Sequence, residues 1–265
     1  MSRSTGGGTI ARVGLLGSLA LALSLGAAAA AAPGPRDIFG VFIGIGGGRP
    51  DIDARWRNKP FTPTPEFTAA GAEQSRQLGR LGIDVRIPSP CDPVNPVTFM
   101  AANGLFPVQI LQGQQQIVML NEWVPVARHI YMDGRGHPSD LLPTWLGHSI
   151  GHWEGNVLVI DTVGLNGRAR PLNAYAANGV SSTQQSLADP RLPASDQMHV
   201  VERIRLVDGG RLLEVVTTIT DPKYYTRPVT NTGYLERRPD IDLQEYYCAD
   251  NMRTHDEGQP GATAP

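Results

Sequence analysis

The sequence is poor in the features by which several classes of protein are recognised. It has two cysteines among 265 residues, and 25 Asp and Glu nearly balance 23 Lys and Arg, so the formal net charge is −2. Such a weak charge gives no electrostatic attraction for nucleic acid or anionic lipid, and we expect neither as a partner. No dinucleotide, metal or haem motif rises above chance, so we predict no cofactor and no metal.

Long hydrophobic runs are also missing, apart from one near the start. Val13–Leu25 follows Arg3 and Arg12 and leads into alanines that end at Ala32. A basic segment, a short apolar core and small residues before a cleavage site are typical of a secretory signal peptide. The core is short for a membrane span, and an uncleaved anchor is the alternative. We therefore predict a signal peptide over 1–32 and a periplasmic or secreted protein that is not held in a membrane.

The two cysteines, Cys91 and Cys248, can pair in an oxidising compartment. Closing so long a loop would stabilise the fold by up to about 4–5 kcal/mol. The alternative is two separate thiols, one beside Pro90 and one at the end of a strand. The sequence leaves both possibilities open.

Glycine and proline, in contrast, are plentiful, with 30 and 22 residues. Residues 33–63 are rich in both, and we interpret them as a loose leader. A single β-rich domain over 64–252 and a disordered tail over 253–265 are predicted to follow. The domain has one predicted helix, over 64–82, because Thr64 can cap it and proline suits the next position.

The other periodic segments are short, rich in β-branched and aromatic residues, and bounded by turn formers, as strands are. In order they are 116–120, 128–132, 147–155, 156–162, 198–207, 211–220 and 243–248. The turns Gly155-Asn156 and Gly209-Gly210 favour hairpins. Consecutive hairpins predict a mainly β fold, an antiparallel meander closed or curled into a lipocalin-like barrel, with a β-sandwich as the alternative. Residues 164–195 lack periodicity and are predicted to form a long loop.

Residues 147–151, GHSIG, fit the G-x-S-x-G pattern of the serine-hydrolase nucleophile elbow. An elbow needs a helix after the serine, but Gly155-Asn156 would interrupt it and a strand comes next. Serine hydrolysis through Ser149 is therefore the weakest alternative. His148 and His152 are also unsuited to sharing a metal ion, because four residues on a strand span about 13 Å.

The turn at Gly155-Asn156 separates an apolar face of its hairpin from a mixed polar face. The polar face carries His148, His152 and Glu154, with Asp161 diagonal from both histidines. This face either meets solvent or lines the interior of a barrel. The sequence leaves the two alternatives open.

Glu202 shares the apolar face of the segment 198–206 and is predicted to point inward. An inward carboxylate must be paired, hydrogen-bonded or raised in pKa. It is either a structural partner of an arginine or a general acid or base in a cavity, unless an edge twist returns it to water.

Asp133, Arg135 and His137 form a polar loop after the strand over 128–132. The loop either closes a turn with its own ion pair or delivers these side chains to a barrel mouth. The sequence again leaves both alternatives open.

Several stretches together resemble a family of mostly uncharacterised, exported bacterial proteins. They are Cys91 with Pro93, Gly104–Pro107, IYMDGRGHP, PTWLGHSIGHWEGNVLVIDT, VVERIR, TITDPKYYTRP and EYYCADN. The resemblance spans about residues 60–251 and implies a β-rich fold with a common pocket near Asp133–His137. This chain departs from the family form at Asn156, where the family has Asp, and in its longer connection at 164–195. The resemblance implies no particular substrate.

Three functions fit these residues. The favoured one is an enzyme without cofactor, an isomerase, lyase, hydratase or hydrolase that acts on a small apolar or aromatic molecule. In it Glu202 or His137 transfers a proton, and Arg135 with Asp133 completes the candidate catalytic set. The second is a periplasmic carrier of apolar ligands, and the third is the serine hydrolase. The candidate ligand-binding residues are Trp145, His148, Trp153, Tyr175 and His199.

Overall fold

The computed structural model describes residues 36–45, 51, 53–80, 94–100, 106–123, 126–168 and 192–247. All of them belong to one compact unit, residues 32–265. The predicted signal peptide, the two cysteines, Tyr175 and the predicted tail lie outside the described residues. The strands are Gly40–Gly44 (β1), Lys59–Thr62 (β2), Val108–Gln112 (β3), Gln116–Asn121 (β4), Arg128–Tyr131 (β5), His148–Glu154 (β6), Val157–Val163 (β7), His199–Val207 (β8), Leu212–Thr220 (β9) and Val229–Arg237 (β10).

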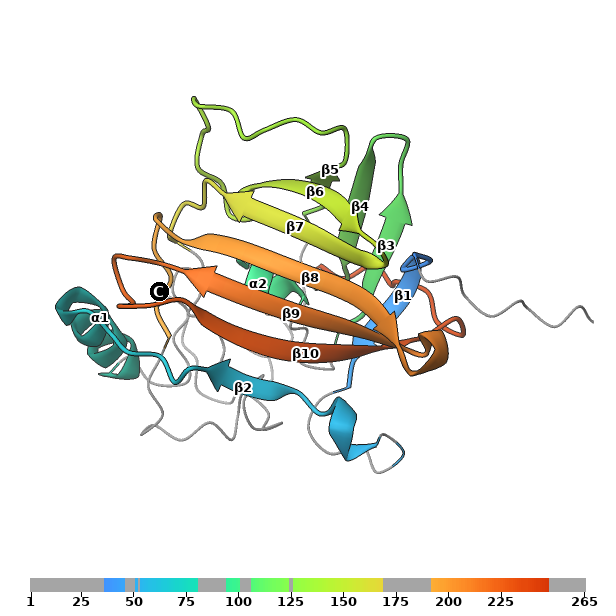
Figure 1. Ribbon diagram of the computed structural model, residues 1–265, viewed down its shortest axis with the longest axis horizontal. Helices are drawn as coiled ribbons and strands as arrows, with labels where there is room; N and C mark the ends of the chain where they lie inside the picture. Colours follow the sequence, from blue (N-terminus) through green and yellow to red (C-terminus); the bar gives the residue numbers. More distant parts are fainter. Residues whose placement is uncertain are drawn as a thin grey trace, which may run out of the picture. The chain divides into compact units, whose positions relative to one another are not determined.

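The strands close into a barrel. Nine of them follow one another in the order β1-β3-β4-β5-β6-β7-β8-β9-β10, and β10 pairs back with β1 from Phe42–Arg237 to Gly44–Leu235. β2 pairs with another part of β10, outside the closed ring. Figure 1 shows β6 to β10 side by side along one wall. The predicted lipocalin-like barrel is confirmed, and the β-sandwich alternative is wrong.

The hairpin registers follow the chemistry of their turns. Gly155, with φ +61°, helps to close the β6–β7 turn, and Trp153 lies opposite Leu158. In the β8–β9 hairpin, Val207 lies opposite Leu212. Both registers are those that two-residue turns at Gly155-Asn156 and Gly209-Gly210 require. Because side chains alternate along a strand, each register decides which residues enter the core.

Apolar side chains fill much of the barrel interior. The main cluster includes Phe42, Ile110, Met119, Ile160 and Ile204. A short helix, Pro96–Met100 (α2), packs into this cluster through Phe99, whose carbonyl accepts a hydrogen bond from the Asn121 side chain (3.1 Å). Figure 1 shows α2 behind β8 and β9. This second helix was not predicted, because so short an apolar segment has no readable period.

The predicted helix is present as Ala69–Arg80 (α1). It begins later than predicted because Thr68, rather than Thr64, caps it: the Thr68 hydroxyl accepts from the Gly71 backbone N–H (3.0 Å) and donates to the Lys223 carbonyl (2.6 Å). Thr68 thereby attaches the start of α1 to the segment after β9. Within the described ranges, no helix is long and apolar enough to cross a membrane.

Three other predictions about the elements are wrong. The stretch 33–63 is not a loose leader, because β1 and β2 lie within it and pair with β3 and β10. Residues 243–247 are not a strand, whereas 108–112 and 229–237 are. The meander is not wholly antiparallel, because β5 and β6 pair in parallel. The composition of 33–63 is a poor guide to its structure, because the few apolar residues of β1 stand among glycines that are typical of loops.

Gly71 provides a test of how closely α1 approaches the barrel. A methyl group on Gly71 would lie 2.1 Å from the Tyr224 carbonyl oxygen. We expect Gly71→Ala to reduce the free energy of unfolding by about 1–3 kcal/mol, because α1 must move. Alanine is itself the better helix former by about 1 kcal/mol, so the clash decides the sign.

Calorimetry should show Tm lowered by about 3–8 °C in Gly71→Ala. Gly136→Ala is the control, because nothing lies within 4 Å of its added methyl group. A Tm of Gly71→Ala at or above that of the native protein would contradict the close approach.

Candidate functional site

The parallel pairing of β5 with β6 determines where the polar side chains meet. Parallel strands end on the same side of a sheet, so residues 132–147 must return along the barrel before β6 can begin. In Figure 1 this light-green connection arches beside β5 and β6. It carries Asp133, Arg135 and His137 onto the wall formed by β5, β6 and β7.

The two faces of this wall carry different polar residues. Ser149 on β6 and Thr162 on β7 are buried inside the barrel. Their neighbours His148 and Asp161 point to the other face and are half-buried. The mixed polar face predicted from the hairpin is therefore the outer side of the wall. The alternative, that it lines the interior, is wrong.

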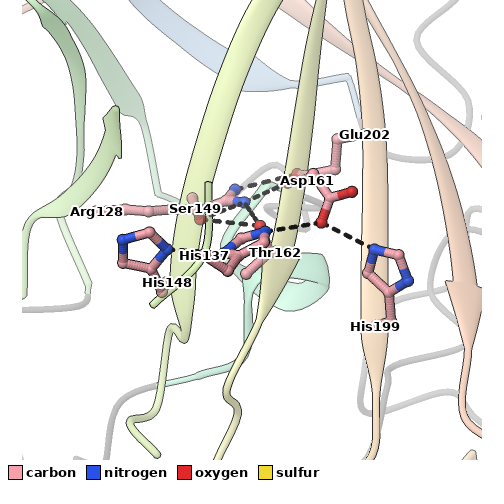
Figure 2. A network of polar contacts seen from close by, with 8 residues as sticks. All are labelled: Arg128, His137, His148, Ser149, Asp161, Thr162, His199 and Glu202. Carbon is pink, nitrogen blue, oxygen red and sulfur yellow. Dashed lines mark hydrogen bonds and ion pairs between the residues drawn. The ribbon is translucent and has the colours of Figure 1, made fainter. Parts of the chain in front are cut away.

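On the outer face, His137 lies between His148 and Asp161 (Figure 2). His137 Nδ1 is 2.8 Å from His148 Nδ1, and His137 Nε2 is 3.1 Å from Asp161 Oδ1. His199, on β8, places its Nε2 at 2.9 Å from the same carboxylate oxygen. The four side chains form one hydrogen-bonded series, His148–His137–Asp161–His199, which we call the relay.

The shared carboxylate fixes the protons along the relay. An ionised Asp161 only accepts, so Nε2–H of His137 and of His199 both donate to it. Neutral His137 then has a lone pair at Nδ1, which accepts from Nδ1–H of His148. His148 Nε2 is left as an unprotonated, basic nitrogen. When that nitrogen takes up a proton, the Nδ1 proton can pass to His137, and the positive charge then lies beside Asp161.

The surroundings of His148 favour its neutral form. Burial lowers the pKa of His148 below its ordinary value, and it is lowered further by the positive charge that His137 carries when protonated and by the charge of Arg135. The Tyr131 ring stacks on His148 with ring centroids 5.2 Å apart, and the Arg135 guanidinium lies 4.1 Å from the Tyr131 centroid. Arg135 Nε donates to Asp133 (2.9 Å), and this pairing lowers the pKa of Asp133. Asp133 thus holds a positive charge close to the basic end of the relay.

Glu202 lies on the opposite side of the wall, inside the barrel. It is fully buried, which confirms the prediction that it points inward. Arg128, at 1% exposure, donates to both carboxylate oxygens of Glu202 and to Thr162 Oγ1 (3.1 Å). Of the alternatives left open by the sequence, the geometry matches the ion pair with an arginine. Glu202 therefore does not meet His137, and the predicted catalytic set is divided between two faces.

Ser149 does not stand at a nucleophile elbow. It lies within β6, which continues as a strand and turns directly into β7. Its hydroxyl is 2.9 Å from Thr162 Oγ1 and 3.4 Å from Arg128 Nη2, and the residue is only 2% exposed. The serine-hydrolase alternative is therefore wrong, because no helix follows this serine and its hydroxyl is buried.

The residues predicted to bind a ligand do not form one site. His148 and His199 belong to the relay, at its two ends. Trp153 lies near the other end of β6 and lines a pocket of about 400 Å³ at one mouth of the barrel. Trp145 lies in the connection before β6, and Tyr175 is outside the described residues.

The histidine spacing in β6 does not gather metal ligands. His152 is exposed and its Nε2 lies 3.2 Å from Glu154, away from the relay. In the part of the chain that the structure describes, no three His, Cys, Asp or Glu side chains are arranged to hold a metal ion.

Four residues of these networks were not among the predicted site residues: Asp161, Arg128, Tyr131 and Thr162. The hairpin register had already placed Asp161 near the histidines, and this was the available signal. Arg128 alternates with exposed His129 on β5 and so shares the inward face with Ile130, but a single strand does not reveal its partner. No family model and no curated protein matches the sequence.

The buried pair predicts a large difference between two chemically similar substitutions. Glu202→Gln leaves the Arg128 charge in the interior without a counter-charge, and we expect a loss of about 3–5 kcal/mol in the free energy of unfolding. Glu154→Gln removes the partner of Arg203, where the two side chains are 49% and 45% exposed. We expect that loss to be much smaller, because solvent screens the attraction between two exposed side chains. Urea unfolding measures both, and equal losses would contradict a buried ion pair.

Proposed function

We propose that this protein is an exported enzyme that performs acid–base chemistry on a small apolar or aromatic molecule with its own side chains and no cofactor. The observation that carries the proposal is the hydrogen-bonded order His148–His137–Asp161. This order leaves the basic nitrogen of His148 at one end. The carboxylate of Asp161 lies beside His137, the ring to which the positive charge passes. A carboxylate that orients an imidazole and stabilises its cation is a recurrent arrangement of general bases.

Each residue has a defined part in the proposed reaction. His148 Nε2 removes a proton from a substrate carbon next to a carbonyl group, or from water, and His137 takes over the positive charge. Arg135, held by Asp133, stabilises the negative charge that develops on the substrate oxygen. Return of the proton to a different carbon gives isomerisation, and departure of a leaving group gives elimination. Asp161 acts as a positioning residue because it contacts His137, and His199 acts through Asp161, which it contacts in turn.

A carrier that binds such a molecule without converting it is the second candidate. The pocket at the barrel mouth, with Trp153 in its lining, favours this function because it lies apart from the relay. The two functions differ in one observable, since a carrier binds its ligand and returns it unchanged.

The proposed periplasmic or extracellular location rests on the segment over 1–32, which has the composition of a signal peptide. Amino-terminal sequencing of the protein recovered from the periplasm or medium tests the location. A start near residue 33 is expected. Recovery of the uncleaved chain in the membrane fraction would contradict it.

Proton abstraction can be tested with 2-tetralone, an aromatic ketone whose protons next to the carbonyl are acidic. We expect the native protein to accelerate their exchange in D₂O, followed by proton NMR. His148→Gln should reduce the rate by about 10²–10⁴-fold, because it removes the basic nitrogen. His152→Gln is the matched control, since His152 is an exposed histidine of the same strand that contacts Glu154 instead of the relay.

The outcomes separate the candidates. A His148→Gln protein as active as the native one would overturn the role of the relay. Saturable binding of 2-tetralone by the native protein without any exchange would favour the carrier.

The pH dependence follows from the lowered pKa of His148. The base acts when it is unprotonated, so the exchange rate should be constant near neutral pH and decline only below the ordinary histidine value of about 6.5. Because folding lowers this pKa, the stability contributed by neutral His148 is present above about pH 6.5 and is lost as the pH falls toward the folded value.

An NMR titration of the histidine ring carbons, assigned with His148→Gln, measures the midpoint directly. Asp161→Asn should move the midpoint further down, because it removes the negative charge that stabilises the imidazolium. A His148 midpoint at or above about 6.5 in the native protein would contradict the proposed burial of the base.

A further inference from the structure

The pocket at the barrel mouth is separate from the relay. β1, β4 and β7 begin at this mouth, and β3, β5 and β6 end there. His148 is the first residue of β6, whereas Trp153 stands near its end. Five residues of strand place these two positions about 16 Å apart. A ligand in the pocket would therefore not touch the basic nitrogen of His148.

The inner part of the pocket is apolar and held in place by the core. It is lined by Phe39, Ile117, Met132 and Trp153. Ile117 is itself a core residue, and the other three are partly buried and pack against the main core cluster. Two aromatic rings and a thioether offer a polarisable surface that suits the face or edge of an aromatic ring.

The rim of the pocket is polar and carries positive charge. It is lined by Arg36, Gln112, Gln114 and Gln116. Arg36 Nε donates to the Gly155 carbonyl (2.7 Å), and the guanidinium lies 5.4 Å from the centroid of the Trp153 ring. Among the described residues, the hydrogen bond that holds this charge over the aromatic part of the pocket is made by Nε. Among the described lining residues there is no carboxylate to neutralise it.

We propose that the mouth pocket binds a small aromatic carboxylate, with its ring against Trp153 and Met132 and its carboxylate on Arg36. A guanidinium can pair with a carboxylate through two parallel hydrogen bonds, and such charge-assisted bonds are stronger than neutral ones. A volume of about 400 Å³ is at the small end of ligand pockets and suits one or two fused rings. The inference goes beyond the proposed function and does not rest on it, because no relay residue lines the pocket.

Titration calorimetry with 2-naphthoate and with its uncharged analogue 2-naphthylmethanol tests the proposal. We expect the native protein to bind the carboxylate at least about tenfold more tightly than the alcohol. Arg36→Gln should weaken 2-naphthoate binding by about tenfold and leave the alcohol within about twofold. Arg203→Gln is the matched control, because it removes the same charge from an exposed arginine outside the pocket.

A second measurement locates the ligand. The indole N–H signal of Trp153, identified by its loss in Trp153→Phe, should shift on addition of 2-naphthoate, and Trp153→Leu should weaken the binding of both compounds. Absence of saturable 2-naphthoate binding, or equal affinity in the native protein and Arg36→Gln, would overturn the proposal. His148→Gln should bind 2-naphthoate as the native protein does, so failure of the pocket and failure of the relay are distinguishable.

Discussion

The parallel pairing of β5 with β6 is the constraint on which the polar architecture of this barrel depends. An antiparallel partner could have followed β5 through a short turn, and His137 would then have stayed near the barrel mouth. Parallel pairing instead requires a crossing connection, which brings His137 back to the first residue of β6. The same geometry lets Tyr131, at the end of β5, stack on His148. The relay is thus a consequence of strand direction as much as of residue type.

Because side chains alternate along a strand, the two faces of one wall place their charged groups in different environments. On the inside, Arg128 and Glu202 are almost without solvent, and each charge is tolerable only because the other is present. On the outside, the Asp161 side chain is 39% exposed and is shared by two imidazoles. A buried ion pair and a partly exposed hydrogen-bonded series of side chains are therefore separated by the thickness of a single sheet.

Much of the fold was predictable where the signals were local. The β6–β7 and β8–β9 registers followed from their turns, and the inward position of Glu202 followed from the apolar residues that flank it. The prediction of a loose leader over 33–63 was wrong because composition does not show strand pairing. Val41 and Phe42 belong to the barrel strand β1. The predicted catalytic set joined Glu202 to His137 because the sequence does not show that they occupy opposite faces of the wall. Asp161 was near the histidines in the predicted register, but nothing local showed that His137 would reach it.

Local stretches of sequence specify the hairpin turns, the period of the strands and therefore which side chains share a face. These properties depend on a few neighbouring residues, through backbone preferences and the two-residue repeat of an extended chain. Three further features emerge only when the whole chain packs together: β1 closes the ring against β10, β5 and β6 run in parallel, and Arg128 is the partner of Glu202. These choices join segments that are distant along the chain. They are set by the burial of the whole core and the satisfaction of every buried charge, neither of which is a property of any one segment.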